Sequence, residues 1–348
     1  MLADRLDYVI GVDSHRDAHA LALLAAPTGA PLLESELSAD RRGYEGALAL
    51  ARAQAPGERL WAIEGSGSYG AGLARYLAEQ GERVVELERP RRRQRRRGKS
   101  DGIDALRAAR AALAETKLAL PRAGGAREGL RALVTTRTGA VAGRRAALNQ
   151  LRALIVIAPE SLRGELRGLT RAKLVTRCLR LRPERRAEPE LRATTLALRA
   201  CARRVSSATA EERELRREIA LLVEQLAPQL LRERGVGVIT AAQLVISWSH
   251  RGRFSGEAAF ARHAGAAPIP ASSGQVERHR LDRGGDRALN RALHTIVLAR
   301  RKHDPATIAY GQRRRAEGKS VRETIRCLKR YLARHLYRVL EAGPMSSA

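Results

Sequence analysis

The stretch YVIGVD at residues 8–13 is an apolar run that ends in an aspartate, and HALALLAA (19–26) and residues 31–37 follow it across a Thr28-Gly29 turn. Short apolar runs separated by turn signals predict three strands, antiparallel to one another. A helix near 41–53, a strand at 60–64, a helix near 70–80 and a strand at 83–88 are expected next. The predicted order is β-β-β-α-β-α-β, which indicates an α/β domain.

Four acidic residues stand at or near the ends of these elements. Asp13 ends the first strand, Glu64 ends the fourth, and Asp101 and Asp104 fall in the first turn of a helix expected from about residue 100 to residue 115. Grouped carboxylates suit Mg²⁺, with Mn²⁺ as a substitute, and such an ion serves phosphodiester chemistry. Taken singly, each carboxylate is better explained as a cap, an ion pair or solvated surface. Together with the strand order they predict a ribonuclease-H-like metal site.

The charge of the chain indicates a nucleic-acid partner. Its 348 residues include 65 Lys and Arg against 37 Asp and Glu, a formal net charge of +28. A GC-rich genome would also raise the arginine content without functional cause. A membrane-surface role fits less well because the charge is spread over every segment. Three cysteines without a C-x-x-C pair, no signal sequence and no long apolar run predict a cytoplasmic protein that neither spans nor coats a membrane.

The densest basic segment covers residues 89–97, where seven of nine residues are arginine. Like charges at this density repel one another unless phosphate neutralises them, so we expect a nucleic-acid-facing loop. Aromatic residues make up only 3% of the chain, so backbone contacts should dominate over base stacking. The predicted nucleic-acid-binding residues are Arg91, Arg92, Arg93, Arg95, Arg96, Arg97, Lys99, Arg278, Arg280 and Arg283.

Beyond residue 121 the pattern becomes helical. Apolar residues recur at helical spacing from Leu130 to Ile155, and Pro159 ends that helix. A second apolar seam from Leu198 to Leu226 is broken only by Glu212, which predicts a helical hairpin or an intermolecular coiled coil. The expected domains are an α/β catalytic domain at 1–120, a helical or coiled-coil oligomerisation region at 121–233 and a mainly helical domain at 234–348.

Two weaker motifs are GVGVITAA, which allows two interpretations, and a pair of histidines. GVGVITAA at 235–242 resembles a helix-hairpin-helix turn whose backbone amides bind phosphate, and equally the start of an ordinary helix with Thr240 near its cap. His15 and His19 are four residues apart in a strand and turn region, where that spacing creates no shared face. Neither histidine is therefore predicted to bind metal.

The segments GVDSHRDAHALAL (11–23), WAIEGSGSYG (61–70), GKSDGIDA (98–105) and AGAAPIPASSG (264–274) resemble the DEDD transposases of insertion sequences whose recombinases are guided by a bridge RNA. The resemblance spans nearly the whole chain. It implies a RuvC-like domain in which the four acidic residues named above bind Mg²⁺. It also implies a C-terminal transposase domain with a nucleophilic serine just before a glycine, here Ser273, with Ser272 as the adjacent rival.

The resemblance further implies a function. The chain would be an insertion-sequence transposase that cuts and rejoins DNA through a covalent phosphoserine intermediate, as a dimer or tetramer, with a guide RNA reading sequence by base pairing. By itself, Ser-Ser-Gly after two prolines is more often only a loop. Two alternatives stay open: a metal-dependent nuclease or junction resolvase in which water attacks, and a decayed element that only binds nucleic acid.

Overall fold

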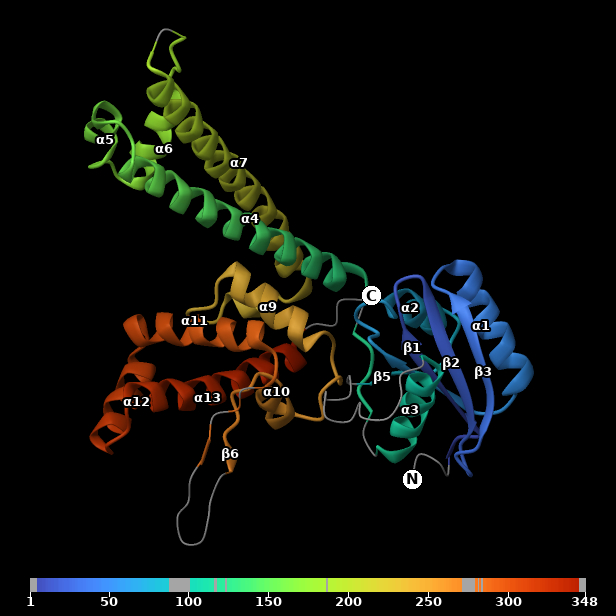
Figure 1. Ribbon diagram of the computed structural model, residues 1–348. Helices are drawn as coiled ribbons and strands as arrows, with labels where there is room; N and C mark the ends of the chain where they lie inside the picture. Colours follow the sequence, from blue (N-terminus) through green and yellow to red (C-terminus); the bar gives the residue numbers. More distant parts are fainter. Residues whose placement is uncertain are drawn as a thin grey trace. The chain divides into compact units, whose positions relative to one another are not determined.

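The computed structural model describes residues 5–87, 101–115, 118–122, 124–185, 187–270, 279–280, 282 and 284–343. The chain divides into two compact units, residues 1–124 and residues 125–348 (Figure 1). The first is a mixed α/β unit and the second is almost entirely helical, which confirms the predicted α/β start and helical remainder. The finer division into three domains stays a prediction.

A five-stranded sheet in the order β3-β2-β1-β4-β5 forms the centre of the first unit. Its strands are β1 (Tyr8–Ser14), β2 (Ala18–Ala25), β3 (Pro31–Ser38), β4 (Arg59–Glu64) and β5 (Val84–Leu87). The first three are antiparallel, as predicted, whereas β4 pairs parallel with β1 and β5 parallel with β4. Helix α1 (Arg41–Gln54) leads from β3 back to β4, and α2 (Ala71–Glu79) is the crossover from β4 to β5.

The two faces of this sheet bury different helices. On one face Ile10 and Trp61 belong to a core that includes residues of α1 and α2. On the other face Val9 and Leu60 belong to a core with α3 (Asp101–Ala114). Successive strand residues point to opposite faces, so the alternation in β1 separates the two cores.

Helix α3 approaches β1 closely because Gly11 has no side chain. A Cβ at Gly11 would overlap the carbonyl oxygen of Ala105 and stand 2.6 Å from the nitrogen of Ala109. The neighbouring strand also presents small residues, since Ala20 and Ala22 cluster with Ala105. Small side chains on both surfaces thus let the helix backbone rest directly on the sheet.

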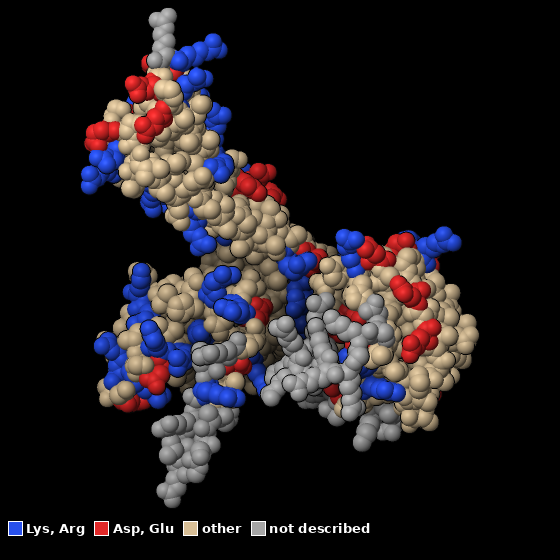
Figure 2. Space-filling model, in the orientation of Figure 1, with Lys and Arg blue, Asp and Glu red and all other residues tan. Residues whose placement is uncertain are grey.

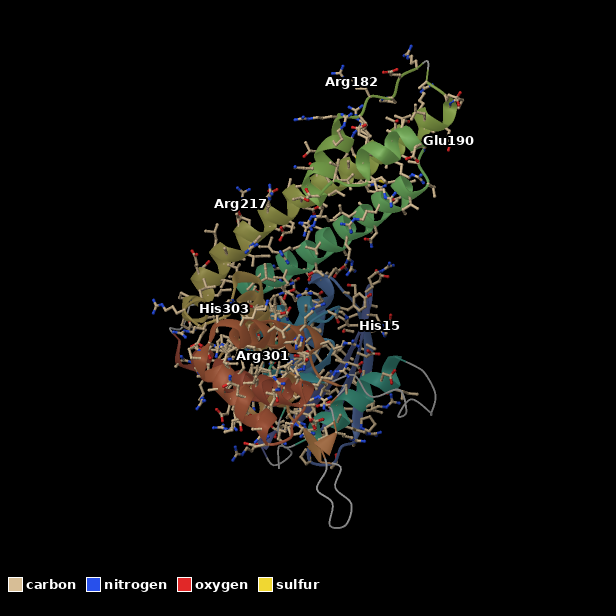
Figure 3. The ribbon with its side chains drawn as sticks, turned by 90° about the vertical axis from the view of Figure 1, so that its left-hand side faces the viewer. His15, Arg182, Glu190, Arg217, Arg301 and His303 are labelled. Atoms are coloured by element: carbon tan, nitrogen blue, oxygen red, sulfur yellow. The ribbon has the colours of Figure 1, made fainter. Side chains whose placement is uncertain are left out.

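The second unit begins with a helical hairpin, which we call the arm. Its long helices are α4 (Gly125–Val156) and α7 (Pro189–Leu226), and α5 (Glu160–Leu166) and α6 (Arg171–Arg180) pack at its far end. Figure 3 shows Arg182 and Glu190 at this tip and Arg217 on the exposed side of α7. The two helices pair within one chain, which is one of the two predicted arrangements; the intermolecular coiled coil stays a prediction.

Glu212, which interrupts the apolar seam of α7, is buried against α4. It accepts a hydrogen bond from Arg137, and the guanidinium of Arg144 approaches it at 4.0 Å. Further along the arm the seam is apolar, where Leu148 packs with Val205. A buried carboxylate is tolerated here because the facing helix supplies the neutralising charge.

The rest of the second unit is a compact group of helices. They are α8 (Pro228–Leu231), α9 (Val238–Trp248), α10 (Glu257–His263), α11 (Arg287–His303), α12 (Pro305–Ala316) and α13 (Val321–Ala342), with β6 (Ile269–Pro270) and β7 (His279–Arg280) as a short antiparallel pair. Leu130 and Ile219 of the arm share one core with Phe260, Leu293 and Leu336. Among the described residues, no helix is long and apolar enough to cross a membrane.

Candidate active site

One row of residues across the sheet carries three carboxylates. The strand registers place Glu36 of β3 beside Ala20 of β2, Ala20 beside Asp13 of β1, and Asp13 beside Glu64 of β4. Residues opposite one another project from the same face, and neighbouring strands lie about 4.8 Å apart. Asp13 and Glu64 are therefore adjacent, and Glu36 lies two strands away on the same face.

This carboxylate row lies on the face that α3 covers. Asp13 follows Gly11 by one strand repeat, and Gly11 is in contact with α3. Ala105, near the start of α3, clusters with Ala20, which belongs to the carboxylate row. Ala112, near the end of α3, belongs to the core that contains Val9 and Leu60, toward the other end of β1 and β4. Helix α3 consequently runs antiparallel to β1, with its first turn toward the carboxylate row.

The first turn of α3 carries the other two predicted ligands. Residues 101–104 form the turn before Ala105, and a Cβ at Gly102 would stand 2.6 Å from a carboxylate oxygen of Glu34 in β3. Asp104 is partly exposed and forms an ion pair with Arg107 one turn on. The backbone of Asp101 begins the helix, and its side chain is outside the described part of the structure. The structure therefore brings Asp13 and Glu64 together, whereas convergence of Asp101 and Asp104 with them stays a prediction.

Asp13 is enclosed by the ends of β1 and β4. Its side chain is 12% exposed, and Nε2 of His15 stands 3.2 Å from its Oδ2. The hydroxyl of Ser14 donates to the backbone carbonyl of Glu64 at 2.7 Å and ties the two strand ends together. Gly65, with a φ of 75°, then turns the chain away from the sheet.

A hollow of about 400 Å³ opens beside the carboxylate row. It is lined by His15, Arg16, Asp17, Ala18, Ala20, Glu36 and Tyr69. The lining combines a cation, carboxylates, an imidazole and an aromatic ring.

Glu36 and His15 were missed by sequence reasoning. The alternation in PLLESELS (31–38) signals that Glu36 shares a face with Glu34, but only the pairing of β3 with β2 brings Glu36 into the row with Asp13. His15 lies two residues after Asp13, a spacing that in a regular strand returns a side chain to the same face. That spacing was the available signal for its contact with Asp13.

His19 lies on the opposite face of the sheet. Its ring stacks on Tyr44 of α1 with centroids 5.8 Å apart, and burial lowers the pKa of His19. The two histidines therefore share no face, in agreement with the sequence analysis.

The carboxylate row fits a divalent metal ion by the chemistry of its donors. Asp13 and Glu64 offer hard oxygen atoms side by side, which Mg²⁺ prefers. Within the described side chains, which exclude that of Asp101, no three His, Cys, Asp or Glu groups form a complete metal-binding cluster. A full ligand set would thus need Asp101, Asp104 or water in addition to the pair.

Several predicted residues lie outside the described part of the chain. They are the serines Ser272 and Ser273 and the basic residues Arg91, Arg92, Arg93, Arg95, Arg96, Arg97, Lys99, Arg278 and Arg283. Arg280 is described: it is exposed in β7, opposite Ile269 of β6.

A polar network holds the chain that follows β7. Asp286 caps α11 by accepting from the backbone nitrogens of Ala288 at 2.8 Å and Leu289 at 2.9 Å. It also accepts a 2.6 Å hydrogen bond from the hydroxyl of Ser247 in α9. Burial opposes ionisation of Asp286, but these bonds outweigh it and lower the pKa of Asp286 below its ordinary value.

Asn290 holds the chain that precedes β6. Its Nδ2 donates to the carbonyl of Ala264 at 2.7 Å, and its Oδ1 accepts from the buried amine of Lys329 at 2.8 Å. Gly285 lies so close that a Cβ there would stand 2.8 Å from the nitrogen of Gly265, and both glycines have positive φ. The two ends of the segment that contains both predicted serines are therefore fixed next to each other.

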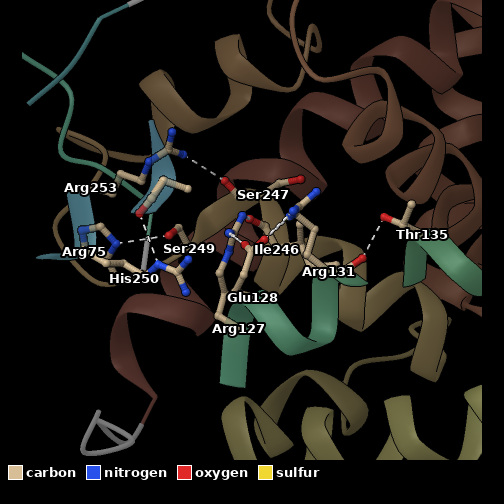
Figure 4. A network of polar contacts seen from close by, with 11 residues as sticks. Arg75, Arg127, Glu128, Arg131, Thr135, Ile246, Ser247, Ser249, His250 and Arg253 are labelled. Atoms are coloured by element: carbon tan, nitrogen blue, oxygen red, sulfur yellow. Dashed lines mark hydrogen bonds and ion pairs between the residues drawn. The ribbon is translucent and has the colours of Figure 1, made fainter. Parts of the chain in front are cut away.

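Two arginines, one buried and one partly exposed, position the end of α9 within the second unit (Figure 4). Arg127 of α4 donates to the carbonyl of Ile246 at 2.6 Å and pairs with Glu128 at 2.9 Å. Arg253 donates to the carbonyl of Ser247 at 3.2 Å. The last carbonyls of a helix favour cations, so both contacts stabilise the helix end from which Ser247 reaches Asp286.

The segment GVGVITAA is a helix start. Helix α9 begins at Val238, and the hydroxyl of Thr240 accepts from the Gly237 nitrogen at 3.0 Å and donates to its carbonyl at 2.8 Å. This is the ordinary capped start that one of the two interpretations predicts. A phosphate contact at this turn stays a prediction.

Two family models match the chain. Residues 10–158 match the transposase model of the IS110 DEDD type, and residues 227–312 match the model described as Transposase IS116/IS110/IS902 family. The chain belongs to the IS110 family of transposases. In this IS110-family chain the first match includes the carboxylate row and α3, and the second includes α9, β6, β7 and the network around Asp286.

A curated relative gives a partial match to this family member. The "Insertion element IS110 uncharacterized 43.6 kDa protein" of Streptomyces coelicolor is 35% identical over 136 residues. The match covers 38% of the present chain and 34% of the relative, about one third of the relative's length.

Proposed function

We propose that the chain is a DNA transposase that cuts and rejoins strands, with a metal-binding carboxylate site in a RuvC-like, ribonuclease-H-like first unit. The observation that carries the proposal is the parallel register of Asp13 and Glu64, on the face of the sheet against which α3 packs. Three antiparallel strands followed by two parallel ones, in the order β3-β2-β1-β4-β5, support this fold assignment.

Mg²⁺, or Mn²⁺ in its place, would supply charge that stabilises the attacking and leaving oxygens of the phosphate. Asp13 and Glu64 would hold the ion with Asp101 and Asp104 from α3. His15, whose Nε2 stands 3.2 Å from Oδ2 of Asp13, would orient that carboxylate. The hollow beside the row would receive the DNA backbone, with Arg16 at its rim to bind phosphate.

The second half of the proposal is a serine nucleophile. The hydroxyl of Ser273 would lose its proton and its oxygen would attack the phosphorus, forming a phosphoester as the bond to the sugar oxygen breaks, and a proton would in balance pass to the departing oxygen. A second strand's hydroxyl would later reverse this step and release the serine. Support comes from the family match over 227–312 and from the anchored ends of the segment. Candidate phosphate contacts are Arg278, Arg280 and Arg283.

Trapping of a covalent protein–DNA adduct tests this function. We expect denaturing gels of native protein with Mg²⁺ and a nicked DNA substrate to show an adduct that Ser273→Ala lacks and Ser272→Ala retains. Asp13→Asn should also lack it. Both Ser273→Ala and Asp13→Asn should still bind DNA.

Two results would overturn parts of the proposal. Adduct formation by Ser273→Ala but not Ser272→Ala would move the nucleophile to Ser272. Cleavage by Ser273→Ala without any adduct would show that water attacks, and the chain would then be a metal-dependent nuclease or junction resolvase.

A guide RNA and an oligomeric assembly complete the proposal. The net charge of +28 and the basic segment at 89–97 support a structured RNA partner in addition to DNA. Sequencing of RNA that copurifies with the protein tests this, since recovery of only random cellular RNA would contradict it. Light scattering of the purified complex would distinguish monomer, dimer and tetramer, and a monomer in the presence of DNA would contradict strand exchange by an assembly.

A further inference from the structure

A pocket of about 420 Å³ lies between α11, α12 and α13, within the second unit. It is lined by Val297, Arg300, Asp304, Ala306, Thr307, Tyr310, Arg313, Leu328, Tyr331, Leu332 and His335. Its volume is in the range of pockets that hold small molecules. The carboxylate site does not use any of these residues.

Two tyrosines meet at this pocket. The ring centroids of Tyr310 from α12 and Tyr331 from α13 are 5.9 Å apart, with the planes at 79°. Tyr331 is 58% exposed, although large aromatic side chains are usually more enclosed. Beneath them, Val297 and Leu332 are buried and provide an apolar floor. The pair places two of the seven tyrosines of the chain at this pocket.

Two arginines stand over the ring of Tyr310. The guanidinium carbon of Arg313 lies 5.3 Å from the centroid of Tyr310, and that of Arg314 lies 5.9 Å from it. The side chain of Arg313 is 68% exposed and reaches Glu317 only at 3.9 Å. Figure 2 shows Lys and Arg side chains gathered over the α12 end of this unit.

The acidic groups near the pocket are already engaged. Glu233 accepts from Arg300 at 2.8 Å and contacts the ring of His335 at 2.9 Å. Asp304 caps α12 and accepts from the backbone nitrogen of Thr307 at 2.9 Å. Asp304 also pairs with Arg234 at 3.3 Å, so both carboxylates have cationic partners that offset their repulsion of an anion beside Arg313.

The phenol of Tyr310 is also neutral. Burial, followed by the neighbouring Cys327, raises the pKa of Tyr310 to about 12. The ring therefore offers an uncharged aromatic surface to a ligand at every pH at which the protein would act.

We propose that this pocket binds an unpaired nucleotide of a single-stranded nucleic acid, with the base stacked on Tyr331 above the apolar floor and the phosphate beside Arg313. Every base has an aromatic face, so such stacking is independent of sequence. A base within a duplex is already stacked on both sides and cannot enter. The pocket would therefore distinguish single strands from duplex, which the spread of positive charge alone cannot do.

Binding of a 2-aminopurine-labelled oligonucleotide to the full chain tests this site. We expect quenching of the label on the native protein, relief of the quenching in Tyr331→Ala, and an affinity for the single strand at least about fivefold weaker in that variant. Tyr331→Phe keeps the ring and should bind like the native protein. The duplex of the same sequence should bind native protein and Tyr331→Ala equally.

Two controls separate stacking from charge. Arg313→Ala should weaken single-strand binding more than Arg217→Ala, which removes one exposed charge from α7 outside the pocket. DNA and RNA oligonucleotides of matched sequence identify which polymer the pocket takes, and a loss for either supports the site. Equal single-strand affinity of Tyr331→Ala and native protein, or an equal loss on duplex, would overturn it. Because binding is measured without cleavage, such a failure leaves the proposed transposase chemistry untouched.

Discussion

The carboxylate of Asp13 lies where β1 ends, largely shielded from water and in contact with His15. Replacement by asparagine keeps the shape of this side chain and removes its charge. We expect Asp13→Asn to reduce Mg²⁺-dependent cleavage by more than the roughly 10- to 100-fold effect of groups that merely orient a ligand. The melting temperature should change little, because no apolar packing is lost.

Asp17→Asn is the matched control for this prediction. Asp17 lines the same hollow but is 75% exposed and pairs with Arg16. Its variant should lose less than about tenfold in cleavage, since an exposed ion pair contributes little. Comparable cleavage by Asp13→Asn and the native protein would contradict the metal-ligand role.

Asp286 makes the stability of the second unit depend on pH. Its pKa in the folded chain is below the ordinary value of about 3.9, so its ionised form contributes stability above that value. The contribution is lost as the pH falls through the lower, folded pKa. We expect Asp286→Asn to lower the melting temperature at neutral pH, with a gap to the native protein that narrows below about pH 4. A gap that stays constant across this range would contradict it.

At the scale of elements, the contact between α3 and β1 depends on a single missing side chain. A Cβ at Gly11 would overlap the Ala105 carbonyl, which is backbone and cannot swing aside. We expect Gly11→Ala to destabilise the first unit by about 1–3 kcal/mol or more in urea unfolding. Cleavage should fall further than the loss of folded protein explains, because the first turn of α3 would shift away from Asp13.

Gly46→Ala provides the comparison within the same unit. Gly46 lies inside α1, and a Cβ there would meet a side-chain atom of Leu37 at an ordinary 3.8 Å. This substitution should stabilise the unit by about 0.5–1 kcal/mol, because alanine favours the helix. If Gly11→Ala is as stable as Gly46→Ala, the close approach of α3 does not constrain the sheet.

The arm depends on the pairing of Glu212 with Arg137. Glu212→Ala should cost about 3 kcal/mol, because it leaves the guanidinium partly buried without its charge partner. The double change Arg137→Met with Glu212→Leu should restore most of that stability, since it continues the apolar seam. Urea unfolding followed by circular dichroism measures both. Additive losses in the double variant would contradict the pairing.

Much of the first unit could be predicted because its strands are short apolar runs bounded by turn residues. The pairing order could not be predicted, since alternation says which residues share a face and not which strands are neighbours. For that reason Asp13 and Glu64 were identifiable at strand ends, whereas Glu36 required the register of β3 with β2.

The second unit was harder to predict in its short elements. Helices α5 and α6 are too short to be stable alone and depend on the core that they share with α7. The low aromatic content predicted little base stacking, but Tyr310 and Tyr331 are brought together only by the packing of α12 against α13. Composition cannot reveal such local concentration.

At the scale of the whole molecule, the net charge of +28 predicts that electrostatics would dominate binding of nucleic acid. A protein that neutralises many phosphates releases as many counterions, so affinity should fall about a thousandfold or more between about 50 and 200 mM salt. Fluorescence anisotropy with one DNA duplex across a salt series measures this slope. An affinity that hardly changes with salt would show that the charge is not used for binding.

Helix α7 runs without interruption from the tip of the arm into the core around α9 and α11. A helix of 38 residues is about 57 Å long at 1.5 Å per residue. Because α4 packs along it, α7 would move as a rigid rod anchored in that core. A small angular displacement at the tip would therefore be transmitted to α9 and α11, the helices whose ends hold Ser247 and Asp286.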